Sequence, residues 1–214
     1  MDWKNEFIDF CIKKKALKFG FFKLKSGRIS PYFFNSGVLS SGIEITKIGL
    51  LYAQSIINSK IEFDVLFGPA YKGIPIVVST AMALKKDYYL NIPYAFNRKE
   101  YKKHGEKGDI IGNNIKNKKI IILDDVITSG KAIHYSIKTI EKNEAQISSI
   151  FVLLDRQEQG KRELSTINCL NDKKKYNITS IITIQDLINY LLKDNILKRY
   201  VPALIQYRKQ YGIY

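Results

Sequence analysis

The chain has 214 residues, of which 45% are hydrophobic, and its formal net charge is +15. This length and apolar content suit one domain with a buried core, and no apolar run approaches the roughly 18 residues of a membrane span. Cys11 and Cys169 are too few for a disulfide framework or a metal knuckle. We therefore expect a cytoplasmic protein without a membrane partner.

The excess positive charge is scattered along the chain rather than gathered in one segment, as in the lysine runs at 13–15 and 173–175. Scattered lysines favour a solvated surface, so we expect no nucleic-acid partner, although a high isoelectric point alone would permit one. A polyanionic small substrate would explain a local concentration of lysines equally well.

Helices are predicted where apolar residues recur every three or four positions, and strands where short β-branched or aromatic runs end at turn residues. In chain order these elements are a helix at 2–18, strands at 19–25 and 32–35, a helix at 44–59, a strand at 65–67, a helix at 73–84, and strands at 94–96, 120–123, 150–154 and 180–183, with helices between and after the last strands. Such alternation predicts an α/β fold with a mostly parallel central sheet flanked by helices.

The segment 98–112 is polar, contains glycines and lacks any period, so it is predicted to be a long loop. Its basic residues are concentrated at the start, in Arg98, Lys99, Lys102 and His104. A solvated connector is one interpretation. We favour a lid, because cations above a site neutralise an anionic leaving group and closure excludes water.

Residues 120–132 read IIILDDVITSGKA: a buried strand, two adjacent carboxylates, a loop of small residues and the start of a helix. A helix start offers unpaired backbone N–H groups to a phosphate. Asp124 and Asp125 would repel that phosphate, but they suit the vicinal hydroxyls of a ribose. The pattern therefore predicts a sugar-phosphate site, with an acidic strand-to-helix turn as the simpler alternative.

This string closely resembles the ribose-phosphate loop of the type I phosphoribosyltransferases. The resemblance implies their fold as a single domain over 1–214, with a small hood from about 1–40 and 155–180. It also implies that Asp124 and Asp125 are catalytic and hold the ribose hydroxyls of 5-phosphoribosyl 1-diphosphate (PRPP). The loop that would hold the 5′-phosphate consists of Val126, Ile127, Thr128, Ser129, Gly130, Lys131 and Ala132.

The turn sequence GPAYKG, at 68–73, lies between a predicted strand and a predicted helix, and its glycines would let the backbone approach an anion. An ordinary connection between strand and helix is the alternative. The resemblance assigns Tyr71 and Lys72 to the diphosphate and implies a strained or cis peptide in this turn.

By the same resemblance, 98–112 becomes a flexible catalytic loop that binds PRPP through Arg98, Lys99, Lys102 and His104. Lys102 is then the main catalytic cation, and Lys25 also contacts the donor. The cofactor is Mg²⁺, held mainly by PRPP oxygens rather than by protein ligands. The family further implies a homodimer with shared active sites.

Residues 24–37 and 151–160 resemble the orotate phosphoribosyltransferases within this family, and the likeness covers nearly the whole chain. It implies that Phe33, Phe34, Thr128 and Arg156 bind orotate, an aromatic carboxylate that suits a flat wall and an arginine fork. Alternation along a strand would place at least one of the two phenylalanines in the core. The alternative for Arg156 is an ion pair with Asp155. The alternatives for function are a purine-type phosphoribosyltransferase and a nucleic-acid-binding regulator on the same fold.

Overall fold

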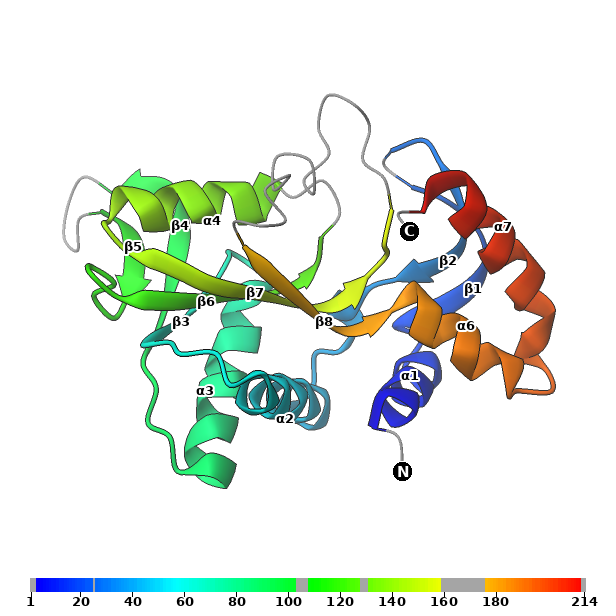
Figure 1. The fold of residues 1–214 in the computed structure, drawn as a ribbon, viewed down its shortest axis with the longest axis horizontal. Coiled ribbons are helices and arrows are strands. Elements are labelled where there is room, and N and C mark those ends of the chain that lie inside the picture. The colour runs from blue at the N-terminus through cyan, green and yellow to red at the C-terminus, as the bar shows by residue number, and fades with distance from the viewer. Residues whose placement is uncertain (1–2, 25, 103–107, 128–130, 159–175, 213–214) are drawn as a thin grey trace. The chain divides into compact units, whose positions relative to one another are not determined.

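The computed structural model describes residues 3–24, 26–102, 108–127, 131–158 and 176–212 (Figure 1). These residues belong to two compact units. The larger unit lies within Ser41–Leu153 and Gly160–Ile181, and the smaller one within Met1–Ser40, Leu154–Gln159 and Ile182–Tyr214. No helix in the described ranges is long and apolar enough to cross a membrane.

The larger unit is built on a six-stranded sheet of order β5-β4-β3-β6-β7-β8. Its strands are β3 (Val65–Gly68), β4 (Tyr94–Lys102), β5 (Gly108–Gly112), β6 (Lys119–Val126), β7 (Gln146–Asp155) and β8 (Asn177–Thr183). Helices α2 (Gly42–Ser59) and α3 (Gly73–Tyr88) cover one face, and α4 (Lys131–Lys142) covers the other (Figure 1). The predicted α/β architecture, a mostly parallel central sheet flanked by helices, is confirmed.

The order of the strands creates a switch point beside β3. The chain first adds β4 and β5 on one side of β3 and then returns to place β6 on its other side. Both β4 and β6 run parallel to β3. The connections leaving β3 and β6 therefore diverge, and open α/β sheets bind ligands in the crevice that this divergence leaves.

Apolar side chains from the sheet and both helical layers form the core of this unit. The run Ile120–Ile122 in β6 is fully buried, as the apolar pattern predicted. On α4, the isoleucines at 133, 137 and 140 are buried, which confirms the helical spacing. Helix α2 buries its predicted face, consisting of Ile48, Leu51, Tyr52 and Ile56.

The connection from β3 to α3 folds tightly upon itself. A Cβ atom on Gly68 would lie 2.3 Å from the carbonyl oxygen of Gly73, and one on Gly73 would lie 2.6 Å from Cδ of Pro69. These distances are far inside van der Waals contact. The two glycines are therefore required by the packing of the turn itself, a reason that differs from the ligand approach predicted for them.

The smaller unit contains an antiparallel hairpin of β1 (Leu17–Lys23) and β2 (Ile29–Phe34), with a bulge between Phe19 and Phe22. Its helical elements are α1 (Trp3–Lys13), η1 (Ser36–Val38), α6 (Ile184–Leu192), η2 (Leu197–Tyr200) and α7 (Val201–Tyr211). This unit brings the first 40 residues together with 154–159 and with the C-terminal helices.

The prediction of a loop over 98–112 is wrong at both ends of that segment. Strand β4 continues to Lys102, and β5 begins at Gly108 and pairs with β4 in antiparallel register. The pairing of Asn97 with Ile110 and of Lys102 with Gly108 supplies backbone hydrogen bonds that need no apolar alternation. Residues 103–107, and with them His104, lie outside the described residues.

Replacing Gly68 by alanine should destabilise the larger unit, because the added methyl group meets backbone that cannot move freely. Overpacking of this kind costs about 1–3 kcal/mol. The control is Gly42→Ala at the start of α2, where an added Cβ meets nothing within 4 Å. Urea denaturation should show a loss of unfolding free energy for Gly68→Ala and a small gain for Gly42→Ala; equal effects would contradict the packing argument.

Candidate active site

Two neighbouring carboxylates mark the end of β6. Strand β6 extends to Val126, and Asp124 and Asp125 are its last two buried residues, only 7% and 8% exposed. The backbone N–H of Asp125 donates to Oδ1 of Asp124 at 2.9 Å. The Tyr52 hydroxyl, from α2, donates to the carbonyl oxygen of Asp124 at 2.6 Å. Strand and helix together thus fix where the acidic pair points.

The electrostatics of the pair are unusual for aspartate. Burial, followed by the like charge of Asp125, raises the pKa of Asp124 from its ordinary 3.8 to about 7. The Asp125 N–H and the Lys72 ammonium oppose this rise. Near neutral pH Asp124 is therefore close to its titration midpoint, and a cation or hydroxyl donor arriving there would draw it toward the ionised form.

Lys72 joins the turn after β3 to the acidic pair at the end of β6. Its Nζ lies 2.7 Å from Oδ2 of Asp125, and its side chain is still 53% exposed. Two motifs separated by about fifty positions in the sequence therefore meet at the switch point between β3 and β6. The structure brings together the predicted diphosphate turn and the predicted ribose carboxylates.

The turn itself has the backbone geometry that the resemblance implied. The peptide bond between Ala70 and Tyr71 is cis. The N–H of Ala70 donates to Oδ1 of Asn97, at 3.0 Å, and Nδ2 of Asn97 donates to the carbonyl oxygen of Arg98. The buried Asn97 side chain thus links the turn to β4.

The ring of Tyr71 and the ammonium of Lys99 form a second contact between the turn and β4. Lys99 Nζ lies 4.1 Å from the ring centroid, a cation–π distance, and Tyr71 is 67% exposed. Arg98, which precedes Lys99 on β4, is partly buried. Four of the predicted donor-binding residues (Tyr71, Lys72, Arg98 and Lys99) therefore belong to the turn after β3 and the neighbouring part of β4.

Several predicted residues fall partly or wholly outside the described structure. Lys25, His104, Thr128, Ser129 and Gly130 are outside it, and for Lys102 and Lys131 only the backbone is described. At the edges of the predicted phosphate loop, Val126 and Ile127 are partly buried, and Ala132 is exposed in the first turn of α4. A strand end and a helix start thus border the loop, as predicted.

The residues predicted to bind the base belong to the smaller unit. Phe33 is 39% exposed and its ring stacks on Phe22 at 5.6 Å between centroids. Phe34 is partly buried. The expectation that one of the two phenylalanines lies in the core was wrong, because β2 buries Tyr32 instead.

Arg156 packs on the strand that carries both phenylalanines. Its guanidinium carbon lies 4.2 Å from the ring centroid of Tyr32. Its Nε donates to Glu158 at 2.6 Å, whereas Oδ1 of Asp155 accepts from the backbone N–H of Gln157. The alternative pairing of Arg156 with Asp155 is therefore not the one that forms.

Sequence reasoning missed the supporting roles of Tyr52 and Asn97. Helical spacing identified Tyr52 only as a core residue, and nothing in the sequence indicates which distant carbonyl its hydroxyl meets. Asn97 adjoins the basic segment but carries no pattern of its own. Contacts between residues so far apart along the chain leave no local signal.

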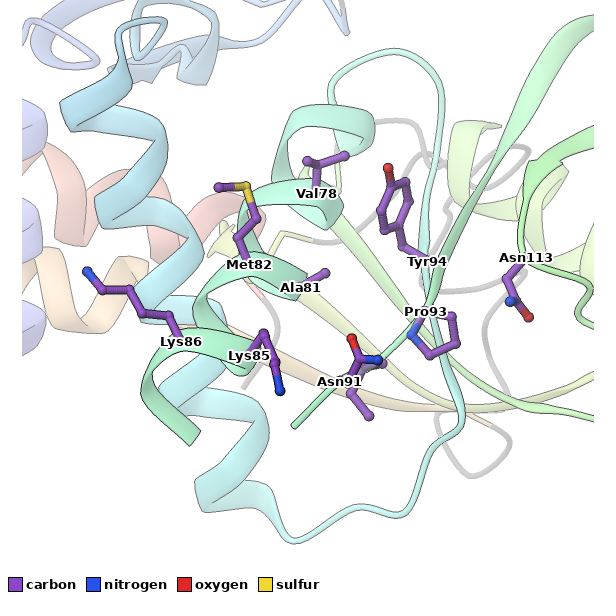
Figure 2. A pocket seen from close by; sticks show the side chains of 10 residues that line it. Val78, Ala81, Met82, Lys85, Lys86, Asn91, Pro93, Tyr94 and Asn113 are labelled. Atoms are coloured by element: carbon purple, nitrogen blue, oxygen red, sulfur yellow. The ribbon is translucent and has the colours of Figure 1, made fainter. Parts of the chain in front are cut away.

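A separate pocket of about 730 Å³ lies on α3 and the segment leading into β4 (Figure 2). Figure 2 shows Met82 and Ala81 projecting from the helix, with Pro93 and Tyr94 on the other side. The pocket contains none of the predicted site residues. Among the described residues, no group of three or more histidines, cysteines or acids is arranged to hold a metal ion.

The model of the phosphoribosyl transferase domain family matches residues 42–183. The orotate phosphoribosyltransferase of Buchnera aphidicola subsp. Acyrthosiphon pisum (strain Tuc7) is 71% identical over 213 residues, which is 100% of both chains. The chain belongs to the orotate phosphoribosyltransferase family.

Two further orotate phosphoribosyltransferases are similar over nearly their full length. That of Shewanella oneidensis is 46% identical over 211 residues, covering 99% of this chain and 98% of the relative. The crystal structure of the Francisella tularensis enzyme has a TM-score of 0.87 at 36% identity and covers 97% of this chain and 100% of its own. Membership in this family favours orotate over a purine base and an enzyme over a regulator.

Replacing Asp124 by asparagine should stabilise the protein above neutral pH. A carboxyl group whose pKa is raised on folding adds stability that is complete below the unfolded pKa of 3.8 and is lost as the pH rises through about 7. Asparagine keeps the acceptor for the Asp125 N–H and has no charge to bury. The gain at pH 8 relative to pH 4 should reach at most about 4 kcal/mol.

Urea denaturation at several pH values would measure this difference between wild type and variant. The control is Asp87→Asn, which removes an exposed carboxylate on α3 and should follow the wild-type pH profile. If the difference in unfolding free energy between wild type and Asp124→Asn does not change with pH, burial does not raise the pKa of Asp124 and this explanation is contradicted.

Proposed function

We propose that this chain transfers the 5-phosphoribosyl group of PRPP to orotate, giving orotidine 5′-monophosphate and diphosphate in pyrimidine biosynthesis. The observation that carries the proposal is the meeting of Lys72 and Asp125, 2.7 Å apart, at the switch point of the sheet. A cation beside two carboxylates is the combination that a sugar diphosphate requires, which supports the proposal. Family membership supplies the identity of the base.

The reaction breaks the C1′–O bond of PRPP and forms a bond from C1′ to a ring nitrogen of orotate, which releases its proton to the departing diphosphate or to water. The electron pair of the broken bond leaves with the diphosphate, so positive charge develops at C1′ and the ring oxygen. Asp124 and Asp125 accept hydrogen bonds from the ribose 2′ and 3′ hydroxyls in this proposal. Their charge also favours the developing cation, which requires both carboxylates to be ionised.

The ion pair of Lys72 and Asp125 is the state that PRPP replaces. On binding, the diphosphate takes the Lys72 ammonium while a ribose hydroxyl takes the Asp125 carboxylate. Lys72 thus exchanges the Asp125 carboxylate for a phosphate anion. Asp125 exchanges the Lys72 ammonium for a hydroxyl donor. Because the pair holds both side chains within reach of the donor beforehand, little reorganisation is needed when PRPP arrives.

Cations of the β4 segment would neutralise the departing diphosphate. The proposed group consists of Arg98, Lys99, Lys102 and His104, with Lys25 as a further donor contact. One cation 4 Å from the leaving group is worth about 4 kcal/mol at an effective dielectric constant of ~20. Lys99 is held by the ring of Tyr71, so the aromatic side chain would serve the diphosphate indirectly.

Mg²⁺ fits this site as an ion carried by the substrate. Its preferred ligands are oxygens of carboxylate, phosphate and water, and the described residues offer the acidic pair but no cluster of three ligands. When bound to the diphosphate oxygens, the ion would add positive charge to the leaving group. Asp124 and Asp125 would remain directed to the ribose.

The base is assigned to residues of the smaller unit and to Thr128. Arg156 would bind the orotate carboxylate, and Phe33 and Phe34 would border the ring. Side chains alternate along β2, which places Phe34 on the face of Ser30 and Tyr32 that Arg156 contacts. Phe34 is therefore the better candidate for the wall beside the carboxylate.

The assembly and compartment are also part of the proposal. We infer a homodimer with shared active sites, in which the 98–112 segment of one subunit reaches the active site of the other. We also infer that the enzyme is cytoplasmic. Support comes from the family resemblance of the basic segment FNRKEYKKHGE. Sedimentation of the purified protein would test the dimer directly.

The decisive test of function is the loss of orotate absorbance on addition of PRPP and Mg²⁺, with hypoxanthine and adenine as alternative acceptors. Turnover of orotate alone is expected. Turnover of a purine base without orotate would overturn the proposal, and absence of any turnover with steeply salt-dependent binding to RNA would favour the regulator.

Replacing Lys102 by alanine should reduce turnover far more than donor binding, because the cation acts on charge that develops only as the diphosphate leaves. A fall in kcat of about 10²–10³ is the size expected for loss of one such group. The PRPP Michaelis constant should change little. The control is Lys118→Ala, which removes an exposed lysine directly before β6, at the opposite end of that strand from the acidic pair. Equal losses in kcat and PRPP affinity for Lys102→Ala would contradict a role specific to the transition state.

A further inference from the structure

A buried polar cluster surrounds the guanidinium group of Arg156 in the smaller unit. The Arg156 side chain is 10% exposed, and its Nε donates to Oε1 of Glu158 at 2.6 Å. Its Nη2 donates to the Ser30 hydroxyl at 2.9 Å and to that of Tyr207 at 3.4 Å. The Tyr32 ring lies against its flat face. The plane of the guanidinium group is thus fixed from three sides.

Glu158 is the centre of this cluster, because it holds three donors at once. Oε1 also accepts from the Tyr207 hydroxyl at 2.9 Å, and Oε2 accepts from Nη1 of Arg28 at 3.1 Å. The Glu158 side chain is only 16% exposed. A carboxylate with three donors, two of them charged, has little freedom to turn.

The backbone and helix α7 hold Glu158 in turn. Residue 158 forms an isolated antiparallel bridge with Gly212, directly after α7. Tyr207, on α7, is buried and contacts both charged groups. Arg28 stacks on Tyr211, one turn further along the same helix, with 4.6 Å from guanidinium carbon to ring centroid. The C-terminal helix therefore supplies one wall of the cluster.

One edge of the Arg156 guanidinium group is left for a ligand. Arginine has five N–H donors in a fixed fork, and the bonds above use those of Nε and Nη2. Within the described ranges, no protein group accepts from Nη1. A carboxylate approaching that edge would meet donors whose direction is already set.

We propose that Glu158 and Tyr207 are positioning residues that orient Arg156 toward the carboxylate of the base. This inference rests on the proposed function, because it takes orotate as the ligand of Arg156. Glu158 fixes Nε, Tyr207 fixes Nη2, and Nη1 then faces the ligand. Neither residue touches the base; each acts through the arginine.

In this arrangement, selectivity for a base with a carboxylate depends on Glu158 and Tyr207, which contact the arginine and not the base. A pyrimidine without the carboxylate would leave the Nη1 donors unpaired in a partly buried site, which is unfavourable. A loosened arginine would discriminate less, because it could turn to water when the carboxylate is missing. Loss of Glu158 or Tyr207 contacts should therefore affect orotate and leave a base without a carboxylate largely unaffected.

The test compares Glu158→Gln and Tyr207→Phe with wild type. Three quantities are measured: the orotate Michaelis constant, the inhibition constant of uracil (the same ring without the carboxylate) and the PRPP Michaelis constant. The orotate constant should rise about tenfold or more in each variant, the loss expected for a weakened charged hydrogen bond. The constants for uracil and PRPP should stay within about twofold, well below that loss.

Lys4→Met is the matched control, since it removes the ion pair of Lys4 with Asp186 in the same unit, away from the Arg156 cluster. It should leave the ratio of the uracil to the orotate constant unchanged. Tyr207→Phe keeps the packed ring, so a changed ratio in a variant with wild-type circular dichroism supports positioning rather than unfolding. Equal losses for orotate and uracil, or a ratio like that of Lys4→Met, would overturn the proposal.

The Arg156→Gln variant distinguishes a failure of this inference from a failure of the proposed function. Failure of the wild type to use orotate would refute the proposed function. If the wild type uses orotate but Arg156→Gln keeps the wild-type ratio, the assignment of Arg156 is wrong and the positioning role falls with it. If Arg156→Gln lowers the ratio while both positioning variants do not, only the positioning role is refuted.

Discussion

The burial of two adjacent carboxylates at the end of a central strand is the constraint on which the site in the larger unit depends. Asp124 and Asp125 end a central strand at a depth where charge is costly, which is why the pKa of Asp124 is raised to about 7. The backbone of Asp125 and the ammonium of Lys72 compensate part of that cost. The tight turn that delivers Lys72 depends in turn on glycine at 68 and 73. Part of the electrostatic cost at the end of β6 is thus offset by a residue from the connection that follows β3.

The smaller unit contains a largely buried cation, the guanidinium group of Arg156, which is also stabilised by hydrogen bonds with its surroundings. Arg156 is largely removed from water, and its direction is fixed by a carboxylate, two hydroxyls and an aromatic face. In each unit, a charged group assigned to the substrate is held by hydrogen bonds with neighbouring residues. Preorganisation of this kind lets a charged group act without first being reoriented.

Much of the fold could be predicted from local patterns. The isoleucines of β6, the helical spacing of α2 and α4, and the strand–turn–helix around GPAYKG all correspond to observed elements, because burial leaves a period in the sequence. The acidic pair could be identified because a buried run precedes it and a loop of small residues and a helix start follow it, a combination more specific than a strand that ends in two acids. The carboxyl-terminal edge of the sheet then follows from parallel topology.

The rest depended on partners that a single sequence does not reveal. Residues 98–102 are polar yet extended, because β5 pairs with them, and pairing at a sheet edge needs no apolar alternation. Alternation misled at Phe33 and Phe34, where β2 buries Tyr32 instead. Asn97, Tyr52, Glu158 and Tyr207 act across large separations along the chain, and only tertiary structure brings them to the groups they hold.

The smaller unit is assembled from pieces at opposite ends of the polypeptide, Met1–Ser40 and Ile182–Tyr214, with Leu154–Gln159 between them. As the ribosome extends the chain, the hairpin of β1 and β2 emerges early, but α7 emerges only after every strand of the central sheet. The larger unit, interrupted mainly near its end, has most of its residues available sooner. Compaction around the central sheet can thus precede closure around Arg156, because the unit that contains this arginine is complete only after α7 has been synthesised.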